Sequence, residues 1–150
     1  MLLRALRMQA LSDSPEAFGS TLEREVARST AEWQRWLGPG AIFFLETADG
    51  PQGLAAGVPD AVEPGVVSLM SMWVHPALRG SGAANTLIGA VIAWAEEVGA
   101  ALIRLDVIEG NDRARRLYER HQFRPTGQVA ERARDGACEI QMERGVRSKE

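Results

Sequence analysis

Apolar residues in the first half of the chain fall into short runs separated by turn residues. The runs cover residues 41–45, 53–58 and 66–74, and Gly, Pro or Asp stand close to the ends of each. Short apolar runs between turn signals are typical of strands. We therefore predict three strands here. The first extends to Thr47, and the third, VVSLMSMWV, has the strongest pattern.

Two helices are predicted before these strands. Leu3, Leu6 and Ala10 recur with helical spacing. The helix that they indicate ends ahead of Pro15, because the residue before a proline avoids the α region. The pattern of residues 21–37 predicts a second helix, and this helix ends at the Gly-Pro-Gly that follows.

The second half begins with a helix between two strands. From Leu87, apolar residues recur four, seven and eleven positions later, which places them on one helical face. Gly99 stands where a helix commonly ends in a left-handed residue. Residues 101–108 then predict a strand. Because a helix separates it from the strand at 66–74, we expect the two strands to run parallel in a βαβ unit.

A shorter helix and a hairpin complete the pattern. Asn111 or Asp112 is expected to cap a helix that carries Ala114, Leu117 and Tyr118 on one face. Two last strands, near residues 123–130 and 137–143, meet at an Asp-Gly pair that is typical of a hairpin.

Together these elements predict the fold class and the number of domains. We expect an α/β chain of the α+β type, with a mixed, mostly antiparallel sheet of about six strands, a central parallel pair and about four helices. A chain of 150 residues fits one domain, 1–150.

Composition and charge exclude several classes of protein. The net charge of −3 argues against a nucleic-acid partner, and the Arg-rich stretches are interpreted as solvated helix faces. Cys138 is the only cysteine, which excludes an internal disulfide and a cysteine-built zinc site. No apolar stretch approaches the roughly 20 residues of a membrane span, and the N-terminus lacks a secretion signal. We therefore predict a cytoplasmic protein with no metal and no membrane partner.

The strongest candidate for chemistry is a glycine-rich loop between the strand at 66–74 and the next helix. Glycines let the backbone approach a ligand, and the first amides of a helix have no partner within it. The helix dipole adds partial positive charge, so the loop suits a phosphate or pyrophosphate. A P-loop and the dinucleotide fingerprint both fit poorly, because the required Lys and third Gly are absent. The loop consists of Arg79, Gly80, Ser81, Gly82, Ala83 and Ala84.

Two blocks of sequence resemble the GNAT superfamily of acyl-CoA-dependent N-acyltransferases. Residues 74–84, VHPALRGSGAA, resemble its signature V-x-P-x-x-R-G-x-G-x-[AG]. Residues 111–123, NDRARRLYERHQF, resemble its stretch N-x-x-A-x-x-L-Y-x-x-x-G-F, in the family's order and spacing. The resemblance implies a GNAT-like fold over roughly residues 41–142 and acetyl-CoA as cosubstrate.

The resemblance also implies roles for individual residues. Backbone amides from Gly80 to Ala84 and at Asn85 would hold the pyrophosphate. The strand end formed by Met72, Trp73 and Val74 would pair with the pantetheine arm.

The remaining implied roles concern the reacting groups. The Val74 amide would face the thioester carbonyl, and Asn111 would contact the pantetheine or the nearby loop. Tyr118 would lie beside the sulfur, where a phenol that is protonated at pH 7 can act as general acid.

The chain departs from the family pattern in three places. The family usually begins with a strand before its first helix, and that strand is apparently missing here. The strand at 41–47 would then be an exposed edge, which makes a homodimer possible. Gln122 replaces a glycine before Phe123, at a position that often needs positive φ. No acidic residue stands on the strand at 66–74, where many members carry a glutamate.

The sequence offers several candidates for the general base and does not decide between them. By the resemblance, Asp106 matches the place of a glutamate base in acetyltransferases of ribosomal-protein N-termini, and the shorter Asp would act through a water. The alternative is a simple ion pair with Arg104 on the same strand face. Glu109 and Glu46 are further candidates. His75 is interpreted as a solvent-exposed loop residue, and His121 as a residue that packs or faces solvent.

These observations favour an N-acetyltransferase in which a primary amine attacks acetyl-CoA directly in a ternary complex. The alternatives are a non-catalytic acyl-CoA-binding sensor and, more remotely, a structural interaction domain. The acceptor stays open between a small molecule and a peptide N-terminus. The pair Trp33 and Trp36, on the second predicted helix, either walls the acceptor pocket or packs that helix onto the sheet.

Overall fold

The computed structural model describes residues 40–132 and 135–146. The two helices predicted before residue 40 and the pair Trp33 and Trp36 lie outside the described residues. The described elements follow the predicted order of strands and helices. They are β1 (Ala41–Thr47), β2 (Gly50–Pro59), β3 (Val66–Val74), the 3-10 turn η2 (Pro76–Leu78), α4 (Ala83–Glu97), β4 (Leu102–Ile108), α5 (Asp112–Arg120), β5 (Arg124–Glu131) and β6 (Cys138–Gly145).

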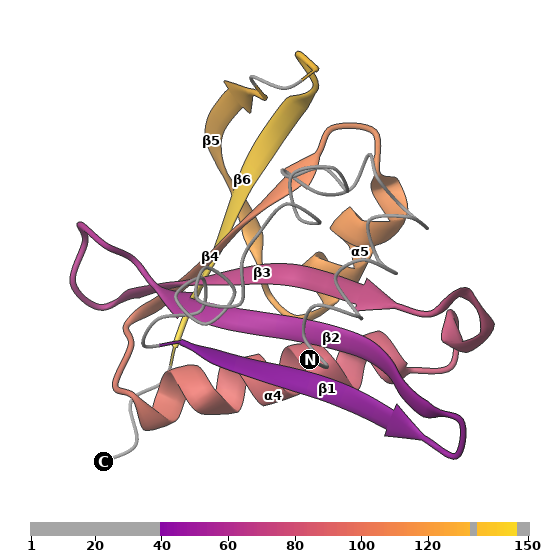
Figure 1. Cartoon of the computed structure of the whole chain (residues 1–150). Helices are drawn as coiled ribbons and strands as arrows, with labels where there is room; N and C mark the ends of the chain where they lie inside the picture. The colour runs from indigo at the N-terminus through magenta and orange to yellow at the C-terminus, as the bar shows by residue number, and fades with distance from the viewer. Residues whose placement is uncertain (1–39, 133–134, 147–150) are drawn as a thin grey trace.

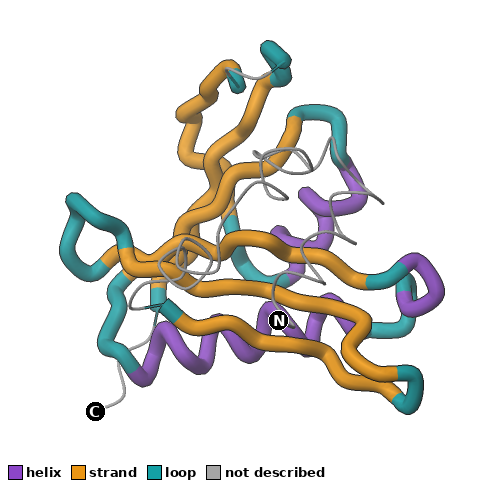
Figure 2. The backbone as a smooth tube through the Cα atoms, in the orientation of Figure 1, coloured by secondary structure: helices purple, strands orange, loops and turns teal. Residues whose placement is uncertain are grey.

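The described strands form one sheet in the order β1-β2-β3-β4-β6-β5 (Figure 1). The pair β3 and β4 is parallel, and every other neighbouring pair is antiparallel. Helix α4 crosses the β1 to β3 half of the sheet (Figure 2). The predicted α+β fold, with six strands and one parallel pair, is confirmed.

The parallel pair is short, and this opens the centre of the sheet. The strands β3 and β4 pair only from Val66, which lies opposite Leu102, to Ser68, which lies opposite Arg104. Beyond that point β4 turns away from β3, and α5 lies between the diverging ends in the view of Figure 1. The last six residues of β3 therefore have no strand partner on the β4 side.

A β-bulge bends β3 within this unpaired part. Two steps along β2, from Leu54 to Ala56, oppose three steps along β3, from Trp73 to Met70. The extra residue lies beside Ser71, which has a left-handed φ of 58°. Such a bulge increases the local twist of the bulged strand, so the end of β3 is turned relative to its start. No glycine marked this position in the sequence.

The hydrophobic core lies on the α4 and α5 side of the sheet. On β4 it takes every second residue, Ile103, Leu105 and Val107, each at most 5% exposed. These side chains belong to one buried cluster with residues of α4, of α5 and of β6. The intervening residues of β4, among them Arg104 and Asp106, therefore face the opposite side of the sheet.

The start of β2 differs from the sequence prediction, whereas the position of the last hairpin turn does not. β2 begins at Gly50, three residues before the predicted start at 53, because the turn at Ala48-Asp49 is tighter than expected. The Thr47 side chain closes it by donating to the Gly50 carbonyl at 2.9 Å and accepting from the Asp49 amide at 3.1 Å. The hairpin between β5 and β6 turns at Asp135 and Gly136 as predicted, with Gly136 at φ 73°.

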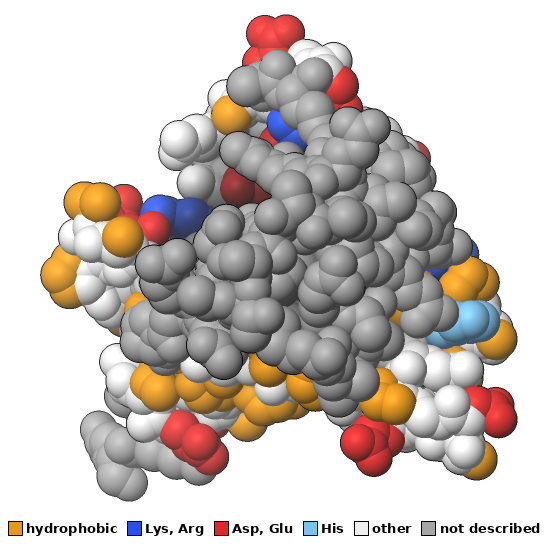
Figure 3. All heavy atoms as spheres, viewed as in Figure 1, with side chains coloured by type: hydrophobic (Ala, Val, Ile, Leu, Met, Phe, Trp, Pro, Cys, Tyr) orange, Lys and Arg blue, Asp and Glu red, His pale blue; other side chains and the backbone are white. Residues whose placement is uncertain are grey.

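β1 lies at one edge of the described sheet. Its side chains are half-buried except that of Glu46. In Figure 3, seen from the same side as Figure 1, hydrophobic side chains form a row below the grey residues, where β1 and α4 run.

Both long helices end in the same hydrogen-bonded cap. In α5 the Phe123 amide donates to the Tyr118 carbonyl at 3.1 Å and the Gln122 amide to the Glu119 carbonyl at 2.9 Å. This is the Schellman motif, in which the residue before Phe123 must be left-handed, and Gln122 has φ 71°. Gly99 fills the equivalent position of α4 with φ 74°, as predicted. The cap packs the Phe123 ring edge-on against Tyr118, with centroids 5.9 Å apart.

Replacing Gln122 by glycine should stabilise the protein. A left-handed conformation costs an L-residue about 1–2 kcal/mol, while the extra freedom of unfolded glycine costs about 0.5–1 kcal/mol. We expect Gln122→Gly to raise the free energy of unfolding by about 0.5–1 kcal/mol, measured by urea denaturation. Gln122→Ala is the control and should bring no comparable gain. A Gln122→Gly variant no more stable than wild type would contradict the strain inferred here.

Candidate active site

A cavity of about 590 Å³ opens beside the unpaired end of β3. Its walls come from that strand end, from the loop leading into α4, and from α5. Among the residues predicted from the sequence, it is lined by Met72, Trp73, Val74, Arg79, Gly80, Gly82, Ala84, Asn85, Asn111 and Tyr118. Ser81, Ala83 and Asp106 were also predicted and do not line it.

The glycine-rich loop presents unpaired amides to this cavity. Gly80 and Gly82 have φ of 83° and 89°, and a Cβ at either position would meet nothing within 4 Å. Gly82 caps α4 without a side-chain hydrogen bond, and the first helical bond is donated by Thr86 to the Gly82 carbonyl at 3.2 Å. Within the described residues, the amides of Ala83, Ala84 and Asn85 therefore have no acceptor. The helix dipole adds positive charge here, so the loop suits an anion.

Internal hydrogen bonds hold the loop in shape. Arg79 Nε donates to the Val74 carbonyl at 3.1 Å and fastens the loop to the end of β3. The Ser81 side chain donates to the Leu78 carbonyl, which explains why this residue is absent from the cavity wall. The loop is thus pre-formed, with Arg79 acting partly as a brace.

His75 differs from its sequence interpretation as a solvent-exposed loop residue. Its side chain is half-buried, and Nδ1 accepts a hydrogen bond from the Ala77 amide at 3.1 Å. The ring also lies edge-on to Trp73, with centroids 6.0 Å apart. His75 therefore caps the η2 turn that leads into the loop.

The amide of Val74 points toward the open side of β3. The His75 amide donates to the Gln52 carbonyl of β2 at 2.8 Å, and the Val74 carbonyl belongs to the same trans peptide group, in which C=O and N–H point in opposite directions. The Val74 carbonyl accordingly faces away from β2, where Arg79 reaches it. The N–H of a strand residue points to the same side as its carbonyl, so the Val74 N–H also faces the unpaired edge.

Tyr118 lies at the inner wall of the cavity. It is 8% exposed, and burial raises the pKa of its phenol to about 12. At pH 7 the ionised fraction is then on the order of 10⁻⁵, so the hydroxyl is a hydrogen-bond donor. Among the described residues, none forms a hydrogen bond with this hydroxyl. A buried hydroxyl without a protein partner is uncommon and is a natural place for a ligand contact.

Asn111 caps the start of α5. Its Oδ1 accepts from the Ala114 amide at 3.2 Å, so Asn111, of the two residues proposed, is the helix cap. The side chain that caps the helix also lines the cavity.

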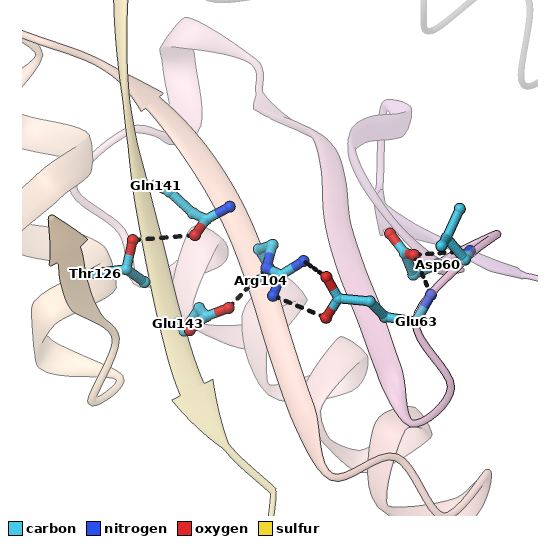
Figure 4. Close-up of polar contacts among 7 residues, drawn as sticks. Asp60, Glu63, Arg104, Thr126, Gln141 and Glu143 are labelled. Atoms are coloured by element: carbon cyan, nitrogen blue, oxygen red, sulfur yellow. Dashed lines mark hydrogen bonds and ion pairs between the residues drawn. The ribbon is translucent and has the colours of Figure 1, made fainter. Parts of the chain in front are cut away.

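The ion pair suggested between Asp106 and Arg104 is wrong. Arg104 instead donates to Glu143 of β6 at 2.7 Å and forms a forked pair with Glu63 at 3.3 and 3.4 Å (Figure 4). Asp106 shares the strand face of Arg104, as alternation predicted, but keeps its carboxylate out of these contacts. Partial desolvation raises the pKa of Asp106, and the charge of Arg104 partly opposes this.

The other candidate bases lie away from the cavity. Glu46 and Glu109 are both exposed, on β1 and after β4 respectively, and neither lines it. The structure therefore brings the predicted coenzyme-binding residues other than Ser81 and Ala83 together with Tyr118 in one cavity, and leaves every candidate base outside it.

Sequence reasoning missed a row of arginines on the cavity wall. Arg113, Arg116 and Arg120 line it from α5, and none of the described lining residues is acidic. Their spacing of i, i+3 and i+7 places them on one helical face, a signal that was present in the sequence and interpreted as a solvated surface.

A histidine joins α5 to the glycine-rich loop. His121 Nε2 donates to Asn85 Oδ1 at 2.8 Å, between the end of α5 and the first turn of α4. The sequence interpretation, that His121 packs or faces solvent, missed this contact. Burial, and then the charges of Arg120 and Arg144, lower the pKa of His121.

The described part of the chain has neither a cluster of metal-ligating side chains nor a membrane-spanning helix. No group of three or more His, Cys, Asp or Glu side chains within it could hold a metal ion. None of its helices is long and apolar enough to cross a membrane.

A sequence model described as the Acetyltransferase (GNAT) family matches residues 6–123. The match includes both sequence blocks, the glycine-rich loop and Tyr118. No curated protein sequence matches the chain.

Solved structures share the fold at low sequence identity. The GCN5-related N-acetyltransferase from Kribbella flavida is 24% identical with a TM-score of 0.73, covering 95% of this chain and 89% of that one. The ribosomal-protein-alanine N-acetyltransferase from Brucella melitensis is 19% identical with a TM-score of 0.75, covering 97% and 93%. The structure of yncA from Salmonella typhimurium with its cofactor acetyl-CoA is 18% identical with a TM-score of 0.76, covering 99% and 89%.

The lowered pKa of His121, caused by burial and by the charges of Arg120 and Arg144, should make stability depend on pH. The unfolded chain binds a proton at His121 near pH 6.5, while the folded protein resists it because the pKa is lowered. The contribution of His121 to the free energy of unfolding is therefore fully present above about pH 6.5, and it is lost as the pH falls through the pKa of His121 in the folded protein. Compared with His121→Gln, wild type should lose more unfolding free energy between pH 7.5 and pH 5, measured by urea denaturation. Parallel pH profiles for the two proteins would refute this role.

Proposed function

Because the chain belongs to the GNAT family of acetyltransferases, we propose that it transfers the acetyl group of acetyl-CoA to a primary amine by direct attack in a ternary complex. One observation supports this most: the unpaired amides at the start of α4, the Val74 N–H and the Tyr118 hydroxyl all belong to one cavity wall. Acetyl-CoA supplies the activated acyl group as a thioester.

The residues present fit this cosubstrate. The amides of Ala83, Ala84 and Asn85 suit a diphosphate, because they have no acceptor among the described residues and lie at the positive end of a helix. The unpaired edge of β3 at Met72, Trp73 and Val74 offers backbone groups to an extended amide-containing arm, as an added strand would use them. Asn111 lies on the same wall. No acidic side chain among the described lining residues opposes the phosphates.

Two groups of the chain act on the reacting atoms in this proposal. The Val74 N–H donates to the carbonyl oxygen, where negative charge develops during attack. Tyr118 donates to the departing sulfur as general acid. Burial raises the pKa of Tyr118 to about 12, so the phenol keeps its proton at pH 7 and has it available for the departing thiolate.

The open centre of the sheet gives the amine its route. Past Ser68 and Arg104 the strands β3 and β4 are unpaired, and in this proposal the amine passes between them. The coenzyme occupies the α5 side of the sheet and the amine approaches from the Asp106 side. Asp106 is our candidate base on that side, acting through water, and its raised pKa brings it closer to the range in which a base can accept a proton near neutral pH.

The acceptor is proposed as a small-molecule or peptide amine. The relative from Brucella melitensis is named for ribosomal-protein alanine, which keeps a peptide N-terminus among the candidates. A cytoplasmic location and a homodimer through the β1 edge remain predictions from the sequence.

The direct test is turnover on an amine panel. Purified protein is titrated with acetyl-CoA by calorimetry, and release of free thiol is then followed with amino acids, peptides, polyamines and amine antibiotics. We expect saturable binding and amine-dependent thiol release with at least one class. Binding without turnover on any amine would contradict the catalytic proposal, and absence of binding would contradict the coenzyme assignment as well.

Tyr118→Phe should separate catalysis from binding. The change removes only the hydroxyl, which no described residue bonds, so the fold and coenzyme affinity should stay close to wild type. We expect kcat to fall at least about tenfold, because the leaving sulfur loses its donor. Tyr118→Leu, which also removes the ring contact with Phe123, is the comparison for structural damage. Unchanged kcat in Tyr118→Phe would remove this residue from the mechanism.

A further inference from the structure

The cavity carries more positive charge than a diphosphate requires. Four arginines line it, Arg79 on the loop and three on α5, while the chain as a whole has a net charge of −3. A diphosphate diester carries two negative charges, and the loop amides with Arg79 already meet them. The arginine row, defined as Arg113, Arg116 and Arg120, is therefore in excess.

The arginine row is not explained by ion pairs within the described structure. None of its three members pairs with a described acidic residue, whereas their neighbour Arg115 bonds Glu119 at 3.0 Å on the adjacent helix face. Like charges at i, i+3 and i+4 on a helix repel one another, so the row is unfavourable without an anion beside it.

The row starts beside the diphosphate loop and extends away from it. His121, the next residue after Arg120, bonds Asn85 in the first turn of α4 at 2.8 Å, which fixes that end of α5 against the loop. From Arg120 back to Arg113 the helix rises by about 10 Å along the cavity wall. An anion held by the row would thus lie close to the diphosphate and separate from it.

We propose that the arginine row is a subsite for the 3′-phosphate of coenzyme A and makes the enzyme select coenzyme A over its dephospho form. This inference rests on the proposed function, since it concerns the same cavity. A phosphate monoester carries about −1.5 to −2 charge at pH 7 and presents three acceptor oxygens, which suits guanidinium donors. Coenzyme A provides such a group in addition to its diphosphate.

Binding of coenzyme A and of 3′-dephospho-coenzyme A, measured by calorimetry, tests the subsite. Charge-assisted hydrogen bonds correspond to about 10- to 100-fold in affinity, so wild type should bind the dephospho form weaker by about that factor. In the combined variant Arg113→Gln, Arg116→Gln, Arg120→Gln the ratio of the two dissociation constants should fall to roughly 3 or less. Arg115→Gln, on the same helix, is the matched control and should keep the wild-type ratio.

The possible results of the binding experiment distinguish a failure of the subsite from a failure of the proposed function. A wild-type ratio near one, or an unchanged ratio in the combined variant, overturns the subsite while leaving the proposed function in place. Equal weakening of both ligands also overturns it, because the row would then act on the diphosphate. No binding of either ligand to wild type would contradict the proposed function itself. Removing like charges should not lower the unfolding midpoint of the combined variant. If that variant nevertheless does not fold, the three single variants replace it, and each should lower the ratio of the two dissociation constants in part.

Discussion

A set of backbone amides at the start of α4 has no acceptor within the described chain, and the rest of the site depends on these unpaired donors. Two left-handed glycines turn the loop so that these amides open toward the cavity. Unsatisfied donors are tolerated where solvent or a ligand can reach them, and the helix dipole makes an anion the favoured ligand. Arg79 fastens this loop to the Val74 carbonyl, so the anion site and the end of β3 have a fixed relation.

That relation matters because β3 has no strand partner on its β4 side there. A parallel pair that stops at Ser68 and Arg104 leaves the Val74 N–H facing an opening instead of a ladder. The bulge beside Ser71 turns this strand end further, and α5 places Tyr118 on the same wall through its cap at Gln122 and Phe123. A sheet that normally satisfies its own backbone is here interrupted at its centre, and in the proposed mechanism the interruption leaves the Val74 N–H available as the oxyanion donor.

Local signals in the sequence predicted much of this arrangement. The bounds of β3, the glycine-rich loop, the Gly99 cap and the capping role of Asn111 depend on neighbouring residues, and each followed from spacing or from backbone preference. Gln122 was identified as a position that needs positive φ because its neighbours match a pattern with glycine there, and its φ of 71° confirms this. Nine of the eleven predicted coenzyme residues, together with Tyr118, line the cavity.

What the sequence did not predict depends on contacts between distant segments. Arg104 pairs with Glu63 and Glu143, which are 41 and 39 positions away, so the local guess of Asp106 as its partner was wrong. The bulge at Ser71 has no glycine to mark it and arises from the pairing of β2 with β3. The arginine row has a clear helical spacing, but only the placement of α5 against the loop shows that its face lines the cavity.

A crystal structure with acetyl-CoA bound tests the central claim most directly. The account predicts that diphosphate oxygens lie within about 3.2 Å of backbone nitrogens between Gly80 and Asn85, as hydrogen bonds require. A diphosphate bound elsewhere, with those nitrogens still unpaired, would contradict it.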